Sequence, residues 1–425
     1  MANTDTTPAT GYVALVRTNV NFRRLWLGNV ISLFGDWFNT IALYRTVETI
    51  SGSALALGLV FIAKLLPLAL ASPVAGLVVD RLNRRRVMIG ADLVRAAIVL
   101  GFLLVPVGGG LALLYTLTTL QIVVSAFFNP AKSASLPNIV AEEDLLTANA
   151  LSSATWSVML AVGAAVGGLA VDALGPQAVF VLDSGTYLLS AWFIARTTIP
   201  QDTDAAEPTA TPVRDGLRRI AEGWQRLREV PRVGRIALAK ASWAVGGGAT
   251  VFLLILLAGV VMPDQPATGI GLLFAARGLG TGIGPILARA VFRDTATWPA
   301  VLGWCIAASG VGYAAVSFAG TLPAIIAFVL FAHAASGANW VLSTVLLQQR
   351  TEDRFRGRVF ATDWLLVTLV ESASVLAAAW LMEAEVADLQ TLFLVFALVQ
   401  VATGVVWLFV IVPRERRETE VRPHP

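Results

Sequence analysis

Five ionisable side chains lie inside long apolar stretches of this chain, where charge is rare. They are Asp36, Lys64, Arg277, His333 and Glu371. A carboxylate or an imidazole in such surroundings can take up and release a proton, and a buried ammonium or guanidinium can hold an anionic group. Each charge is costly in a membrane interior, so function is the first explanation for keeping it. Asp36, Glu371 and His333 are therefore the candidates for proton coupling.

The competing interpretation is structural. Asp36 with Lys64, and Arg277 with Glu371, could be ion pairs that only neutralise one another. Pairing and function are nevertheless compatible, because a substrate or a proton can compete for a paired acid.

The elements that must position these residues are membrane helices. The 425 residues are 56% hydrophobic and 14% charged, and the mean hydropathy is +0.72. Soluble chains carry about 25% charged residues, so a soluble protein is not expected. The recurring apolar runs are long enough to cross a hydrocarbon core of roughly 30 Å. They predict an all-α membrane protein with twelve transmembrane helices, near 25–46, 54–79, 87–107, 111–133, 147–172, 177–196, 233–260, 267–290, 297–318, 322–347, 359–381 and 389–412.

Depth along these helices brings the ionisable residues to one level. At 1.5 Å per residue, all five lie about 15–18 Å from a helix end, near the bilayer midplane. Polar residues at helical spacing form stripes beside them in several spans. These stripes give the substrate-cavity candidates: Asn29, Ser32, Asn39, Lys64, Tyr115, Thr118, Ser125, Asn129, Trp243, Arg277, Ser336 and Trp340.

Arginine distribution sets the predicted orientation. Arginines crowd alternate connections, such as 81–86 and 350–358, whereas the intervening connections are almost bare of them. The positive-inside rule then places both termini in the cytoplasm. Net charge is only +3, and the basic residues are scattered between apolar runs, so nucleic acid is not an expected partner.

The chain divides into two similar halves. RTNVNFRRLWL at 17–27 aligns with REVPRVGRIAL at 228–238, and FIAK at 61–64 aligns with FAAR at 274–277. The offsets, 211 and 213 residues, nearly agree, which predicts two six-helix halves related by a pseudo-twofold axis along the membrane normal. The expected organisation is a cytoplasmic tail (1–20), an N-terminal half (21–196), a cytoplasmic linker (197–232), a C-terminal half (233–412) and a second tail (413–425).

The linker is predicted to contain an amphipathic helix. Its apolar stripe is formed by Leu217, Ile220, Trp224, Leu227 and Val230. This helix is expected to lie on the membrane surface or to act as a simple linker.

One polar stretch carries a family resemblance. GLVVDRLNRRR at 76–86 resembles the signature between spans 2 and 3 of the major facilitator superfamily, and FFNPAKSASLPNIVAEEDLLTANAL at 127–151 resembles the bacterial branch of enterobactin-type and macrolide-type exporters. Asn83 stands where the family has glycine, and it is expected to keep the turn because asparagine tolerates positive φ. Two antiporter features are absent: span 5 keeps Gly163, Gly167 and Gly168 without a proline, and span 4 has no early arginine.

The resemblance implies a gate at the cytoplasmic end. In the family fold the aspartate of the signature faces the start of span 11, so Asp80 and the neighbouring arginines are expected to latch the halves together when this end is closed. The inner-gate residues are Gly76, Asp80, Arg81, Asn83, Arg84, Arg85 and Arg86.

Together these features predict a secondary active exporter in the bacterial inner membrane. It would export an amphiphilic or lipophilic small molecule by alternating access, coupled to proton antiport. A transporter of lysophospholipids or siderophores is the alternative, and a non-transporting membrane scaffold or sensor is the alternative of another class. No enzyme activity, cofactor or metal site is expected. The expected partners are the small-molecule substrate, protons and membrane lipids, and the expected state is a monomer.

GLGTGIG at 278–284 is interpreted as a helix-packing segment, since it lies inside a span.

Overall fold

The computed structural model describes residues 11–79, 81–201 and 212–421, and the described part contains helices without any strand. The first half contains α1 (Tyr12–Thr18), α2 (Val20–Ser51), α3 (Ala54–Val79), α4 (Arg84–Gly101), η1 (Phe102–Leu104), η2 (Val105–Gly109), α5 (Gly110–Ile139), η3 (Glu142–Asp144), α6 (Leu145–Leu174) and α7 (Pro176–Ala195). After α8 (Pro212–Glu229), the second half contains α9 (Pro231–Val261), α10 (Pro266–Val291), η4 (Thr295–Thr297), α11 (Trp298–Val316), α12 (Leu322–Arg350), α13 (Asp353–Glu383), α14 (Leu389–Val406), η5 (Trp407–Ile411) and α15 (Val412–Val421).

The predicted all-α membrane architecture is confirmed. Within the described residues, 10 helical segments are long and apolar enough to cross a membrane. One of them, Arg84–Ile139, holds both α4 and α5, which meet at a bend where Gly108 and Gly110 have φ of 137° and 57°. The 32-residue α2 is not among these segments, and polar residues recur along it. If α4 and α5 are counted as two crossings and α2 is added, the total is twelve, which stays a prediction.

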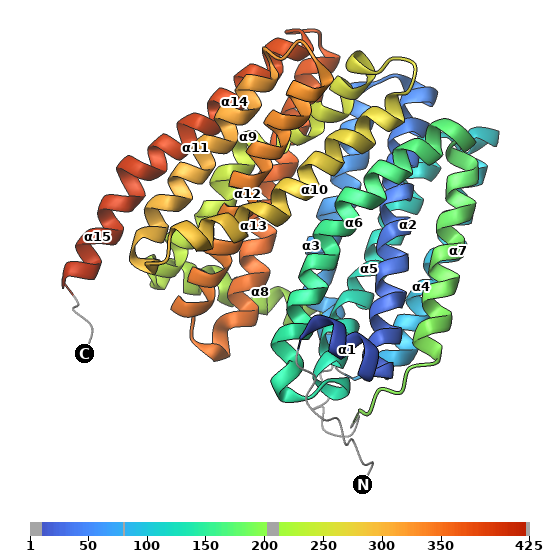
Figure 1. The fold of residues 1–425 in the computed structure, drawn as a ribbon, viewed down its shortest axis with the longest axis horizontal. Coiled ribbons are helices and arrows are strands. Elements are labelled where there is room, and N and C mark those ends of the chain that lie inside the picture. The colour runs from blue at the N-terminus through green and yellow to red at the C-terminus, as the bar shows by residue number, and fades with distance from the viewer. Residues whose placement is uncertain (1–10, 80, 202–211, 422–425) are drawn as a thin grey trace.

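The two halves repeat one packing pattern. In the first half α2 packs against α6 and α7, and in the second half α9 packs against α13 and α14. Likewise α3 packs against α5, and α10 packs against α12. Figure 1 shows the halves as two adjoining bundles, one blue to green and one yellow to red. Between the bundles, α6 packs against α10 and α3 packs against α13, so these four helices form the main contact between the halves.

Glycines allow the closest of these contacts. A Cβ atom built on Gly168 of α6 would lie 2.3 Å from the Ala267 carbonyl oxygen of α10. Inside the second half, a Cβ atom on Gly284 would lie 1.8 Å from the Ala334 carbonyl oxygen of α12. Both distances are far below van der Waals contact, so only glycine permits this approach. The interpretation of 278–284 as a packing segment is confirmed.

The linker helix α8 joins both halves at one end. Its stripe is only partly covered, since Leu217 is 63% exposed whereas Leu227 is buried. Gly223 packs against α13, where the Ile220 carbonyl accepts a hydrogen bond from Thr362 Oγ1 at 3.3 Å, and Gly216 packs against α3. The linker thus contains a helix over Pro212–Glu229, and its amphipathic contact with the membrane surface stays a prediction. The first and last described helices, α1 and α15, lie at the same end of the molecule as α8 (Figure 1).

Candidate functional site

A cavity of about 290 Å³ lies between the two halves. Four of the five predicted midplane residues line it: Asp36 and Lys64 from the first half, and Arg277 and Glu371 from the second. His333 does not line it. The remaining lining residues are Asn29, Ser32, Leu33, Trp37, Thr40, Tyr44, Phe61, Leu65, Leu68, Arg95, Gln121, Ile122, Ser125, Phe128, Asn129, Trp156 and Phe274. Charged groups from both halves thus face one space whose remaining wall is largely apolar and aromatic.

Asp36 is held by a hydrogen-bonded chain from three helices. The Tyr187 hydroxyl of α7 donates to Asp36 Oδ1, and Gln121 Nε2 of α5 donates to the Tyr187 hydroxyl oxygen at 3.0 Å. Lys64 does not pair with Asp36; its Nζ donates to Thr40 Oγ1 at 2.7 Å. The alternative interpretation, an Asp36–Lys64 ion pair, is therefore not found among the described contacts, and Asp36 keeps acceptor capacity toward the cavity.

Arg277 and Glu371 also remain apart. Across the described ranges no ion pair or side-chain hydrogen bond joins them, although both line the cavity. The Arg277 guanidinium lies 5.5 Å from the centre of the Phe274 ring. Gly248 of α9 sits against Glu371, because a Cβ atom there would lie 3.0 Å from Glu371 Cγ. Neither of the two proposed structural pairs is thus formed.

A further charge cluster in the first half was missed by the sequence analysis. Arg95 is buried, pairs with Asp92 one helical turn earlier, and lies 4.5 Å from the Phe128 ring centre and 4.4 Å from that of Tyr187. Both residues fall inside the span predicted at 87–107, and their i, i+3 spacing was the signal that could have identified them. Nearby, Lys132 Nζ donates to the Asn29 side chain at 2.8 Å. On this side of the cavity the charged and polar side chains therefore form a buried network, in which Arg95 Nε and Asp92 Oδ2 have no hydrogen-bond partner among the described residues.

A second missed cluster lies in the other half, away from the cavity. Lys240 Nζ of α9 and Asp363 Oδ2 of α13 form a buried ion pair at 2.6 Å. The ammonium lies 5.2 Å from the Trp340 ring centre, and Trp340 packs edge-on against Trp364. Trp340, predicted as a cavity residue, therefore contacts this ion pair and does not line the cavity.

Two other cavity candidates, Tyr115 and Trp243, and the proton-coupling candidate His333 bond neighbouring helices. Tyr115 donates to the Ala56 carbonyl at 3.1 Å, Trp243 Nε1 donates to Ser309 Oγ at 3.1 Å, and His333 Nε2 bonds the Tyr313 hydroxyl at 2.5 Å. Three more candidates are buried without lining the cavity: Asn39, Thr118 and Ser336. A polar stripe on a helix can face a neighbour of its own half, and sequence spacing alone does not distinguish that face from a cavity face.

The inner-gate segment is anchored within the first half. Asn83 is the N-cap of α4, with φ of −62°, and its side chain accepts from the Arg86 N–H at 3.0 Å. The expectation that Asn83 supports a positive φ is therefore wrong. Arg84 donates to the Ala134 carbonyl at 2.8 Å, and Arg85 donates to the Ala195 carbonyl. Gly76 is not closely packed, because a Cβ atom built there would meet nothing within 4 Å. The Arg81 N–H donates to the Val78 carbonyl at 3.2 Å. Asp80 lies outside the described residues.

The halves are joined by hydrogen bonds at the end opposite α8. Glu383 of α13 accepts from the Ser53 hydroxyl at 2.9 Å and from the Leu55 N–H at 3.2 Å, at the start of α3. Asp172 of α6 accepts from the Thr268 N–H at 2.7 Å, at the start of α10. By the predicted topology this is the extracellular end. The cavity is thus closed off at that end by direct contacts between the halves.

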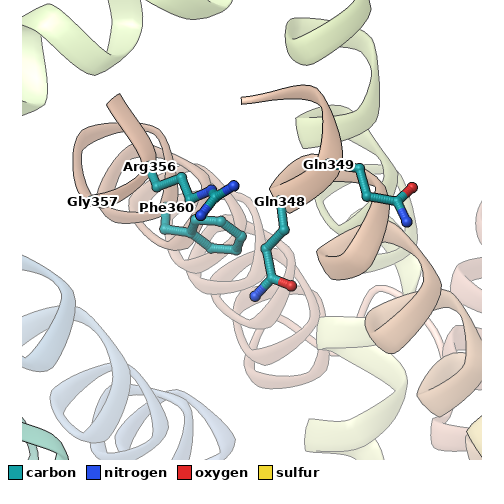
Figure 2. Close-up of a pocket in the computed structure, with 5 residues that line it drawn as sticks. All are labelled: Gln348, Gln349, Arg356, Gly357 and Phe360. Atoms are coloured by element: carbon teal, nitrogen blue, oxygen red, sulfur yellow. The ribbon is translucent and has the colours of Figure 1, made fainter. Parts of the chain in front are cut away.

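A second hollow lies at the end that carries α8. It has a volume of about 500 Å³ and is lined by Gln348, Gln349, Arg356, Gly357 and Phe360. Figure 2 shows Gln348 extending from α12 toward the Arg356 and Phe360 side chains of α13. None of the midplane candidates lines this hollow. Among the described residues no group of three His, Cys, Asp or Glu side chains could hold a metal ion.

Two similarly packed helical bundles that enclose a charged cavity between them are the architecture of a multi-pass membrane transporter. The family model described as "transmembrane secretion effector" matches residues 10–354. The chain belongs to this family of major facilitator transporters.

Several curated relatives are named as exporters. The chain is 27% identical over 303 residues to an uncharacterised transporter of this superfamily from Bacillus subtilis, YfiS, covering 70% of this chain and 63% of that one. It is 28% identical over 209 residues to the putative bacilysin exporter BacE of the same species, covering 47% and 50%. It is 28% identical over 216 residues to macrolide efflux protein A of Streptococcus pyogenes, covering 49% and 52%. The chain thus matches only about half to two thirds of the length of these relatives.

Solved structures share the fold. A bacterial homologue of the human lysosomal transporter Spinster, solved in an inward-facing and unoccupied conformation, superposes with a TM-score of 0.69 at 17% identity, covering 96% of this chain and 99% of that one. An autoinhibited peptide transporter of the POT family superposes with a TM-score of 0.71 at 12% identity, covering 93% and 96%. At these identities the likeness concerns the fold alone.

Proposed function

We propose that this protein is a proton-coupled antiporter that exports amphiphilic or lipophilic small molecules across the bacterial cytoplasmic membrane by alternating access. Both termini lie in the cytoplasm, and the protein works as a monomer. The observation that carries the proposal is Asp36: a carboxylate that lines the central cavity, has a neutral hydrogen-bond donor in Tyr187, and has no ion-pair partner among the described residues.

The cycle follows from that placement. In the arrangement described, the predicted extracellular end is held shut, so substrate enters the cavity from the cytoplasm or the inner leaflet. Rocking of the halves then exposes the cavity to the outside, where a proton replaces the substrate at Asp36. Protonation removes the negative charge beside Lys64 and Arg95, and the site returns inward with the proton. The aromatic side chains that line the cavity suit a substrate with apolar surface.

The test is transport by purified protein in liposomes under an imposed pH gradient, over a panel of lipophilic dyes and antibiotics. Asp36→Asn keeps the size of the side chain and removes its titration, so gradient-driven transport should be lost while the protein remains folded. Asp264→Asn, at an exposed position of the loop between α9 and α10, is the matched control and should transport as the wild type does. Transport by Asp36→Asn at the wild-type rate would refute the coupling role.

A further inference from the structure

Some buried charged residues of this protein form ion pairs, and others do not. Arg95 pairs with Asp92, and Lys240 pairs with Asp363, each within one half. Burying a charge without a partner is expensive, so pairing is the normal state inside a membrane protein. Arg277 and Glu371 depart from this rule, because neither has an ion pair or a side-chain hydrogen bond in the described part of the chain.

Both unpaired groups face the central cavity from the same half. Arg277 is 11 residues from the start of α10, and Glu371 is 12 residues from the end of α13, so each lies about 16–18 Å deep at 1.5 Å per residue. The helix segments that carry them are tightly packed, since Gly278 contacts Ala161 and Gly248 contacts Glu371. A guanidinium and a carboxylate are thus presented at one level, at fixed backbone positions.

Aromatic side chains stand beside this pair. Trp37 of α2 packs edge-on against Phe274, with ring centres 6.1 Å apart. Tyr44 of α2 stacks on Phe61 of α3 at 6.4 Å. All four rings line the cavity. A ligand between the halves therefore meets the two opposite charges of the second half together with aromatic surface from both halves.

We propose that Arg277 and Glu371 form the recognition site for a zwitterionic substrate. Arg277 binds the anionic group through its guanidinium fork, Glu371 binds the cationic group, and the aromatic wall covers the apolar part. This inference rests on the proposed transport function and deepens it: the second half recognises the substrate, and Asp36 in the first half carries the proton. The shared chemistry fits two sources, an amino-acid-like or peptide-like molecule and a lysolipid with a zwitterionic headgroup.

The test measures binding to the purified full-length protein in nanodiscs made of phosphatidylcholine. The soluble probe is the dipeptide phenylalanyl-alanine, compared with its N-acetyl form, its C-terminal amide and its N-acetyl amide. The lipid probes are lysophosphatidylethanolamine and the anionic lysophosphatidylglycerol. Wild-type protein should bind the zwitterion of at least one series about 10- to 100-fold more tightly than the forms lacking either charge, the range for hydrogen bonds to charged groups.

The variants assign each charge to its partner. Arg277→Gln should erase the preference for the free carboxylate within the dipeptide series while keeping the preference for the amine. Glu371→Gln should erase the preference for the amine in either series while keeping the preference for the carboxylate. Arg293→Gln and Glu385→Gln, both at exposed positions, are the controls and should retain both preferences. If a single variant unfolds, the double variant Arg277→Gln/Glu371→Gln, which keeps the net charge, should fold and lose both preferences together.

Each outcome decides the proposal. Preference for the zwitterionic dipeptide or for the zwitterionic lysolipid supports it and identifies the source. Equal binding of charged and neutralised probes, binding of none of them, or equal loss for all probes in Arg277→Gln overturns it. If gradient-driven export of dyes that requires Asp36 persists in such a case, the proposed function stands and only the zwitterion assignment fails.

Discussion

Two carboxylates hold the halves together at the predicted extracellular end, and they occupy equivalent positions in the repeat. Asp172 at the end of α6 caps the start of α10, and Glu383 at the end of α13 caps the start of α3. The carboxylates are 211 residues apart and the capped N–H groups of Leu55 and Thr268 are 213 apart, the same two offsets that relate the sequence halves. Each half therefore supplies one carboxylate and receives one.

Loss of these caps should open this end. A carboxylate that accepts from a helix N-terminal N–H stabilises the contact by about 1 kcal/mol. The two contacts lie on different helix pairs, so Asp172→Ala with Glu383→Ala should cost the closed arrangement about 2 kcal/mol. That change lowers the ratio of closed to open molecules roughly 30-fold. Each single variant should lower it about fivefold.

Distances between spin labels measure the opening directly. Suitable label pairs are Ile50 with Val386, 41% and 60% exposed, and Leu174 with Val260, 59% and 67% exposed, in a Cys305→Ser background. Each pair joins the two halves at the capped end, and the double variant should populate a longer distance in both pairs.

A cap of the same chemistry supplies the control. Asp388 accepts from the Thr391 N–H at 2.7 Å at the start of α14, entirely within the second half. Asp388→Ala removes a helix cap at the same end without touching the contact between the halves, so its distance distributions should match the wild type. Unchanged distributions in the double variant, or equal changes in Asp388→Ala, would refute the reasoning.

Three further predictions concern stability. Lys240→Ala should lower the free energy of unfolding by about 3–5 kcal/mol because it strands the buried Asp363 carboxylate, and Lys240→Met with Asp363→Leu should recover most of the loss in thermal unfolding. Gly284→Ala should lower the melting temperature, whereas Gly185→Ala, where a Cβ atom meets nothing within 4 Å, should leave it unchanged or raise it. The backbone N–H bonded at the start of α14 holds the pKa of Asp388 below its ordinary value, so its stabilising effect is present above about pH 4 and is lost as pH falls through the lowered pKa. Asp388→Asn should therefore flatten the acid side of the stability profile, measured as melting temperature between pH 7 and pH 3.

The sequence predicted the depth of the site residues along their helices better than it predicted which side chains they contact. Apolar run length and depth counting placed Asp36, Lys64, Arg277 and Glu371 at one level, and the structure brings all four to one cavity. Depth is one coordinate, and rotation about the helix axis is the other. His333 shares the depth but faces Tyr313 within its own half, because polar spacing does not state which neighbour a face meets.

The missed ion pairs have a related cause. Lys240 and Asp363 are 123 residues apart, and only the packing of α9 against α13 brings them together. No local spacing encodes such a pair, although each residue alone could have been noticed as a charge inside a predicted span. Asp92 and Arg95 are different, since their spacing of three residues can be seen within one predicted span.

The inner-gate segment shows where a family resemblance and a local structure diverge. Arg84 and Arg85 were expected to bond across the cleft when the cytoplasmic end closes. Their guanidinium groups instead donate to the Ala134 and Ala195 carbonyls, near the last turns of α5 and α7. Cations at the carboxyl ends of helices are favoured by the helix dipole, and these contacts lie within one half. In this arrangement of the halves, Arg84 and Arg85 therefore brace the end of the first bundle. The latch belongs to the state in which the cytoplasmic end is closed and stays a prediction, whereas at the opposite end carboxylates already reach the other half.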